Sequence, residues 1–136
     1  MSAIIANYEV VIKNTSDPST SVATANLDAD RYSEIIPLER AFVGDIQLNF
    51  AAGPVGTLYF QVSQDFGVGD DSGVERINSE NIITNWANHS NIVVGATDST
   101  ALFKITDIGS RWGRLFWDST SGTGAVSSCR ANIKGW

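Results

Sequence analysis

The stretch WGRLFWDSTSGTGAVSSCRANIKGW, residues 112–136, decides the fold class. Apolar and small residues recur at every second position on both sides of a polar interruption, Ser121–Gly124. This period of two is typical of a half-buried β-strand, whose successive side chains point to opposite faces. The two glycines suit a tight turn with positive φ. The stretch therefore predicts two paired strands joined by a hairpin, with Trp117 pointing into the core.

The same alternation recurs upstream and predicts further strands. These lie at residues 8–13, 42–50, 58–63 and 101–106, with weaker patterns at 22–27 and at 33–38, where Pro37 breaks the strand. The glycine-containing segment 51–56 predicts a second hairpin. Residues 86–91 read as a loop, and residues 79–88 allow at most a short helical turn that Ser79 would cap. We therefore expect an all-β protein: an antiparallel β-sandwich, jelly-roll-like, of about eight strands.

Length and charge limit the class of protein. The chain has 136 residues, which fits a single domain over 1–136, with residues 1–41 as an extended arm or as outer strands. Its net charge is −6, from 15 acidic and 9 basic residues. A phosphate-binding surface needs an excess of Lys and Arg, so we expect no nucleic-acid partner. No apolar run approaches the roughly 20 residues of a membrane span, so we expect no membrane insertion.

The residues that carry catalytic chemistry are sparse. His89 is the only histidine and Cys129 the only cysteine, which is too few ligands for a zinc site. No Gly-x-Ser-x-Gly elbow is present, and the glycine-rich segments lack the lysine of a phosphate-binding loop. We interpret Cys129 as a small buried apolar residue. The sequence predicts a protein that is not an enzyme and has no catalytic residue.

One acidic, glycine-rich segment raises the question of a metal. Asp65, Asp70, Asp71 and Glu75 supply four carboxylates between residues 65 and 75. Calcium takes six to eight oxygen ligands, but the spacing here does not match an EF-hand. The pattern favours a solvated loop, with calcium bound by these four residues as the alternative. We expect no other cofactor.

The aromatic residues supply candidate contact surfaces. If Trp117 faces inward, then Trp112, Arg114 and Phe116 form an outward stripe, and Trp136 closes the chain. Arg and aromatic side chains are enriched at protein interfaces, so these four residues are interface candidates. Flat rings also suit stacking against sugars. A saccharide platform would draw on Tyr32, Tyr59, Trp86, Trp112, Trp117 and Trp136.

These residues also resemble a known group of proteins. The runs Gly109–Gly124 and Ala131–Gly135, with Phe50–Asp65 upstream, are similar to a pattern in small bacteriophage structural proteins. There, an aromatic-x-Arg-hydrophobic strand leads into a C-terminal Thr-Ser-Gly-Thr-Gly hairpin. The resemblance covers roughly residues 42–136. The sequence departs from it at Gly113, where a branched apolar residue is usual.

The resemblance implies a non-enzymatic virion structural protein acting through protein–protein contacts. It would be a capsid shell, decoration or tail-surface component, made in the host cytoplasm and located in the virion. Its partners would be copies of itself, as a homo-oligomer, and other virion proteins. The alternative is a carbohydrate-binding or host-attachment β-sandwich module, whose partner is a host-surface glycan. Both hypotheses share the fold and differ in the partner.

Overall fold

The computed structural model describes residues 3–10, 12, 26–38, 41–64, 85–106 and 108–135. Within them the chain forms nine β-strands and no helix, so none is long and apolar enough to cross a membrane. The strands are β1 (Ala3–Glu9), β2 (Arg31–Tyr32), β3 (Ile36–Pro37), β4 (Ala41–Phe50), β5 (Val55–Ser63), β6 (Ala87–Val94), β7 (Thr100–Ile105), β8 (Trp112–Ser121) and β9 (Val126–Gly135). The predicted all-β class is confirmed.

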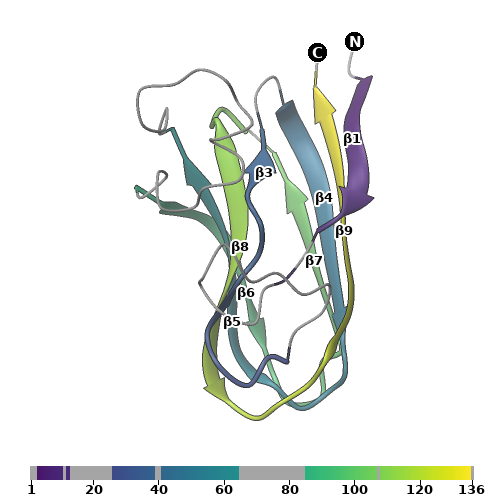
Figure 1. The fold of residues 1–136 in the computed structure, drawn as a ribbon, viewed down its shortest axis with the longest axis vertical. Coiled ribbons are helices and arrows are strands. Elements are labelled where there is room, and N and C mark those ends of the chain that lie inside the picture. Colours follow the sequence, from purple (N-terminus) through teal and green to yellow (C-terminus); the bar gives the residue numbers. More distant parts are fainter. Residues whose placement is uncertain are drawn as a thin grey trace.

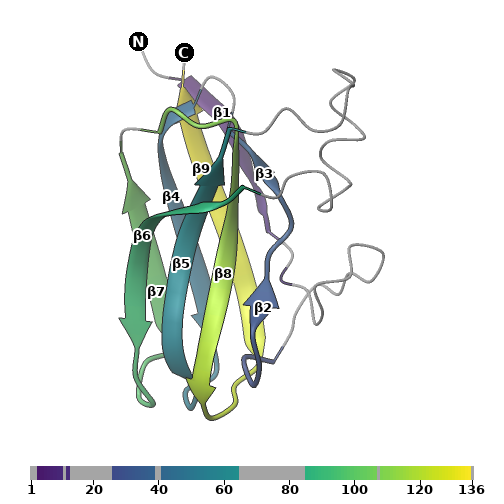
Figure 2. The ribbon, with the colours of Figure 1, turned by 90° about the vertical axis from the view of Figure 1, so that its left-hand side faces the viewer.

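The strands form two antiparallel sheets that face each other (Figure 1). Sheet 1 has the order β1-β9-β4-β7, and sheet 2 has the order β2-β8-β5-β6, with β3 also pairing β8. Figure 2 shows sheet 2 in front and sheet 1 behind it. The strand pairs are nested in the sequence, with the outermost strands paired with each other and the innermost likewise: β1–β9, β2/β3–β8, β4–β7 and β5–β6. This order is that of a jelly roll, which confirms the predicted architecture.

The core lies between the sheets and is built from alternate residues of each strand. Sheet 1 contributes Ile46, Leu48 and Ile133, and sheet 2 contributes Phe60 and Trp117, all almost fully buried. Each such side chain contributes roughly 1.5–3 kcal/mol through removal of its apolar surface from water. Trp117 is 2% exposed, as its position in the alternating pattern predicts.

Gly113 lies where the core leaves no room for a larger side chain. A Cβ atom at Gly113 would lie 2.8 Å from Leu38 Cδ1 and 2.9 Å from Phe60 Cζ. The side chains of Leu38 and Phe60 therefore occupy the space that a larger residue would need.

Both predicted hairpins are wrong. Ser121–Gly124 connects β8 in sheet 2 to β9 in sheet 1, and segment 51–56 connects β4 in sheet 1 to β5 in sheet 2. Both segments do require glycine, because φ is +134° at Gly53 and +78° at Gly122. Glycine signals that the chain turns, but it does not tell which sheet the next strand joins.

The two connections pack against each other, which explains their glycines further. The Ala51 N–H donates to the Ala125 carbonyl at 2.9 Å. A Cβ atom at Gly53 would lie 2.5 Å from the Thr123 carbonyl oxygen. A Cβ atom at Gly124 would overlap the Ala51 carbonyl oxygen. Backbone therefore approaches backbone at this end of the sandwich, and only glycine allows the approach.

Two local predictions also need correction. Residues 86–91, read as a loop, contain the first half of β6, and residues 87–88 of the expected helical turn belong to this strand. The alternation expected around Ser127 shifts by one residue. Asn49 pairs with Ser128, but Phe50 pairs with Val126, so a bulge leaves Ser127 outside and buries Val126.

The strand patterns near the N-terminus are met only in part. The strand predicted at 8–13 overlaps β1 only at residues 8 and 9, the last two of β1. Beyond β1, Ile12 forms an isolated bridge with Ser33. Segment 33–38 contains β3, where Pro37 fits because β3 pairs only with β8 and lies at the sheet edge. Residues 22–25 and 79–84 lie outside the described residues.

Candidate binding face

Cross-strand pairing gathers aromatic side chains on the outer face of sheet 2. Tyr32 pairs with Phe116, and Phe116 pairs with Tyr59, which forms one row across β2, β8 and β5. Asn91 of β6 continues this row beside Tyr59. All four point away from the core because their chain neighbours point into it. Residues far apart in the sequence thus form one continuous row.

The three rings of this row lie almost parallel. The ring centroids of Tyr32 and Phe116 are 4.7 Å apart with an interplanar angle of 20°. Those of Phe116 and Tyr59 are 6.0 Å apart at 17°. These separations follow from the strand spacing of about 4.8 Å, which brings opposite residues into contact. All three rings are half-buried, so the row presents an apolar strip to solvent.

A polar row runs beside the aromatic strip. The Arg114 guanidinium carbon lies 4.3 Å from the ring centroids of both Tyr32 and Trp86. Arg114 Nε donates to Gln61 Oε1 at 2.8 Å, and Gln61 Nε2 donates to Asn88 Oδ1 at 3.0 Å. The cation is therefore held between two rings and by an amide, which fixes its position. Sequence reasoning missed Gln61 and Asn88, because their roles depend on the pairing of β5 with β6.

The predicted outward stripe is present, but its first member is covered. Trp112 is 3% exposed and packs with Ile35 and Trp86 in a small cluster outside the main core. The covering residues come from the same chain, so Trp112 packs within its own subunit although it lies on the outward side of β8. Arg114 and Phe116 remain half-exposed on this face. The assignment of these residues to an interface with a partner stays a prediction.

The remaining predicted site residues are not placed by the structure. Trp136 and the four candidate calcium ligands Asp65, Asp70, Asp71 and Glu75 lie outside the described residues. In the described ranges, no group of three or more His, Cys, Asp or Glu is arranged to hold a metal ion.

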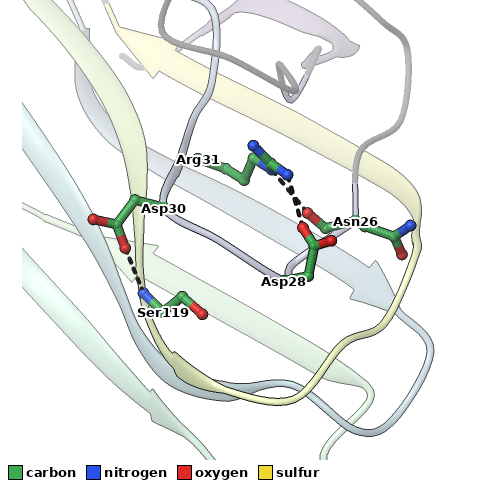
Figure 3. A network of polar contacts seen from close by, with 5 residues as sticks. All are labelled: Asn26, Asp28, Asp30, Arg31 and Ser119. Atoms are coloured by element: carbon green, nitrogen blue, oxygen red, sulfur yellow. Dashed lines mark hydrogen bonds and ion pairs between the residues drawn. The ribbon is translucent and has the colours of Figure 1, made fainter.

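Polar contacts stabilise the loop before β2 and join it to β8 (Figure 3). The Ser119 N–H of β8 donates to Asp30 Oδ1 at 2.9 Å. Arg31 Nε donates to the Asn26 carbonyl at 2.9 Å, and its terminal nitrogen pairs with Asp28 Oδ1 at 2.7 Å. The loop is therefore fastened to β8 at a position three residues along the strand from Phe116.

The outer face of sheet 1 has a different character. Its outward side chains on β4, β7 and β9 are mostly charged or polar, namely Asp45, Gln47, Asn49, Lys104, Ser128, Arg130, Asn132 and Lys134. Leu102 is its large exposed hydrophobic residue, at 43% exposure. The aromatic strip on sheet 2 is thus the more suitable surface for a ligand with apolar faces.

The single cysteine and the single histidine of the chain lie in different environments. Cys129 is buried in sheet 1, as expected from the sequence, and burial raises the pKa of its thiol to about 12. The thiol therefore stays protonated near neutral pH and is a poor nucleophile. His89 is exposed on β6, where its ring meets the edge of Phe60 at 5.7 Å between centroids.

Comparisons with known proteins support the fold. No protein-family model and no curated protein sequence matches the chain. Among solved structures, the chain is similar to chitosan-binding module 1 derived from a chitosanase/glucanase of Paenibacillus sp. IK-5. The TM-score is 0.50 and the identity 13%, over 96% of this chain and 92% of the module. At this identity the similarity shows a shared β-sandwich fold.

Proposed function

We propose that the chain is a non-catalytic carbohydrate-binding module and that the outer face of sheet 2 holds the glycan. The observation that carries the proposal is the half-exposed row of Tyr32, Phe116 and Tyr59, bordered by Gln61 and Asn88. Rings offer large contact area to the apolar C–H faces of sugars. Amide side chains donate to and accept from hydroxyl groups. The face combines both kinds of contact.

The rigidity of the face supports binding. Arg114 is held between the rings of Tyr32 and Trp86, and its Nε is bonded to Gln61. Side chains that are already ordered lose little conformational freedom when a ligand binds, so more of the contact energy appears as affinity. The similarity in fold to a chitosan-binding module agrees with this function.

A glycan array probed with the whole chain, followed by calorimetry on the best glycan, tests the proposal. We expect Tyr59→Ala to weaken binding by about tenfold, since truncating an anchor residue typically costs more than 1 kcal/mol. Thr97→Ala is the control, because it truncates an exposed side chain in the turn between β6 and β7, outside the aromatic row. A chain that binds no glycan, or a Tyr59→Ala variant that binds as tightly as the parent, would contradict the proposal.

The second candidate is a virion structural protein, a capsid shell, decoration or tail-surface component. The jelly-roll strand order favours it, because viral capsid domains use this architecture as lectins do. Val93, 74% exposed on edge strand β6, is an apolar contact that self-association would bury. Such a protein would bind copies of itself and other virion proteins, and would be found in virions. A chain that sediments as a monomer at all concentrations and is absent from purified particles would exclude it.

A further inference from the structure

The outer face of sheet 1 carries a shallow depression with a distinctive set of side chains. It has a volume of about 130 Å³ and lies over β4, β7 and β9. Asp45, Lys104, Asn132 and Lys134 line it, and a neighbouring hollow that shares the first three adds Arg130.

Strand pairing explains the charge pattern of the depression. Asp45 lies directly opposite Lys104 on β7 and Asn132 on β9. Arg130 and Lys134 lie two positions to either side of Asn132, on the same face of β9. Three cations thus face two carboxylates, Asp45 and Glu9, which lies directly opposite Arg130 on β1, in a chain whose net charge is −6. The face is a local positive patch on an acidic protein, which favours an anionic ligand.

Asn132 adds a second, independent observation. Its Oδ1 atom is buried and has no hydrogen-bond donor among the described residues. A buried acceptor without a donor is unfavourable, so native structures usually supply one. A hydroxyl group of a ligand is such a donor. Lys104 and Lys134 have long, flexible side chains that can move aside to admit it.

We propose that this depression binds an acidic saccharide, a ligand with one carboxylate and several hydroxyl groups. The carboxylate would lie between the ammonium groups of Lys104 and Lys134, and hydroxyl groups would donate to Asn132 Oδ1 and to Asp45. Asp45 disfavours an anion that lacks donors, such as sulfate, because two negative charges would then face each other. The site is on the opposite sheet from the aromatic strip and does not depend on the function proposed for that strip.

Titration of the full chain with glucuronate, followed by amide NMR shifts, tests this inference. Glucose and inorganic sulfate are the comparison probes. We expect shifts at residues 43–45, 104–106 and 132–134 with glucuronate, and much weaker binding of the other two. Lys104→Gln and Lys134→Gln should each weaken binding by about tenfold, because each removes a charged donor. Added salt should weaken it too.

Thr97→Asp is the matched control. It makes the same change of one charge unit in the exposed turn between β6 and β7, and should leave the affinity unchanged. The inference fails if glucose or sulfate binds as well as glucuronate, if neither lysine substitution matters, or if the shifts map to Tyr59 and its neighbours. Tyr59→Ala should not alter glucuronate binding here, so failure at this site and failure at the aromatic strip are distinguishable.

Discussion

Replacing Gly124 with alanine tests the packing of the two connections that cross between the sheets. Gly124 is buried, and its carbonyl accepts the Leu27 N–H at 2.9 Å. An alanine Cβ there would overlap the Ala51 carbonyl oxygen and lie 2.7 Å from Pro54 Cδ. The described glycines with positive φ are Gly53 and Gly122, so backbone conformation alone does not require glycine at position 124. If residues 121–124 formed an exposed hairpin turn, Gly124→Ala would change the stability little. If the two connections pack against each other, the substitution should lower the stability strongly.

The magnitude follows from the atoms that collide. Forcing a methyl group into a packed interior costs about 1–3 kcal/mol, and this methyl meets main chain that cannot rotate away. Alanine also lowers the conformational entropy of the unfolded chain, which offsets about 0.4–1 kcal/mol of this cost. Because the methyl group meets rigid main chain, the cost lies at the upper end of the first range, about 3 kcal/mol, and we expect the free energy of unfolding of Gly124→Ala to fall by about 2 kcal/mol. For a chain of this length, roughly 4 °C per kcal/mol translates this into a fall in Tm of about 8 °C.

Urea and thermal unfolding, followed by tryptophan fluorescence, measure the effect. Gly109→Ala is the control, because a Cβ at Gly109 would have no atom within 4 Å. Its free energy of unfolding should stay within about 0.5 kcal/mol of the parent's. If Gly124→Ala unfolds with the same midpoint as Gly109→Ala, the connections do not pack as described here.

Two further predictions concern buried polar groups. Burial, then the negative charges of Glu34 and Glu9, raise the pKa of the Cys129 thiol from 9.0 to about 12. Because the unfolded thiol ionises first, this contribution to stability is complete below pH 9 and is lost between pH 9 and 12. Between pH 9 and 12, the free energy of unfolding of Cys129→Ala should therefore fall less steeply with pH than that of the parent chain. Parallel curves of unfolding free energy against pH for the two proteins would refute the reasoning. Ser33→Ala removes the Oγ that accepts the buried Leu115 N–H at 2.8 Å, and should cost about 1–3 kcal/mol in urea unfolding, against almost nothing for a substitution at an exposed serine.

Residue alternation predicted the inward side chains well because it is a local property of a strand. Leu48 and Trp117 are buried because every second side chain of a strand faces the same side. The pairing of strands is not local. Glycines such as Gly53 and Gly122 occur equally in a hairpin and in a connection between sheets. The sequence therefore predicted the turns correctly but assigned the wrong pairing to the strands that they join. Similarly, the bulge at Ser127 arises where β9 pairs with β4, and periodicity alone does not reveal this pairing.

The same distinction applies to the candidate binding face. Alternation predicted that Trp112, Arg114 and Phe116 point outward, but exposure depends on what other strands and loops place above them. Ile35 and Trp86 cover Trp112, so the heaviest ring of the stripe is unavailable to a ligand. Phe116 instead gains flanking rings on β2 and β5, which turns a three-residue stripe into a strip across three strands. The order of the strands in sheet 2, more than the aromatic residues of β8, therefore determines which surface can bind.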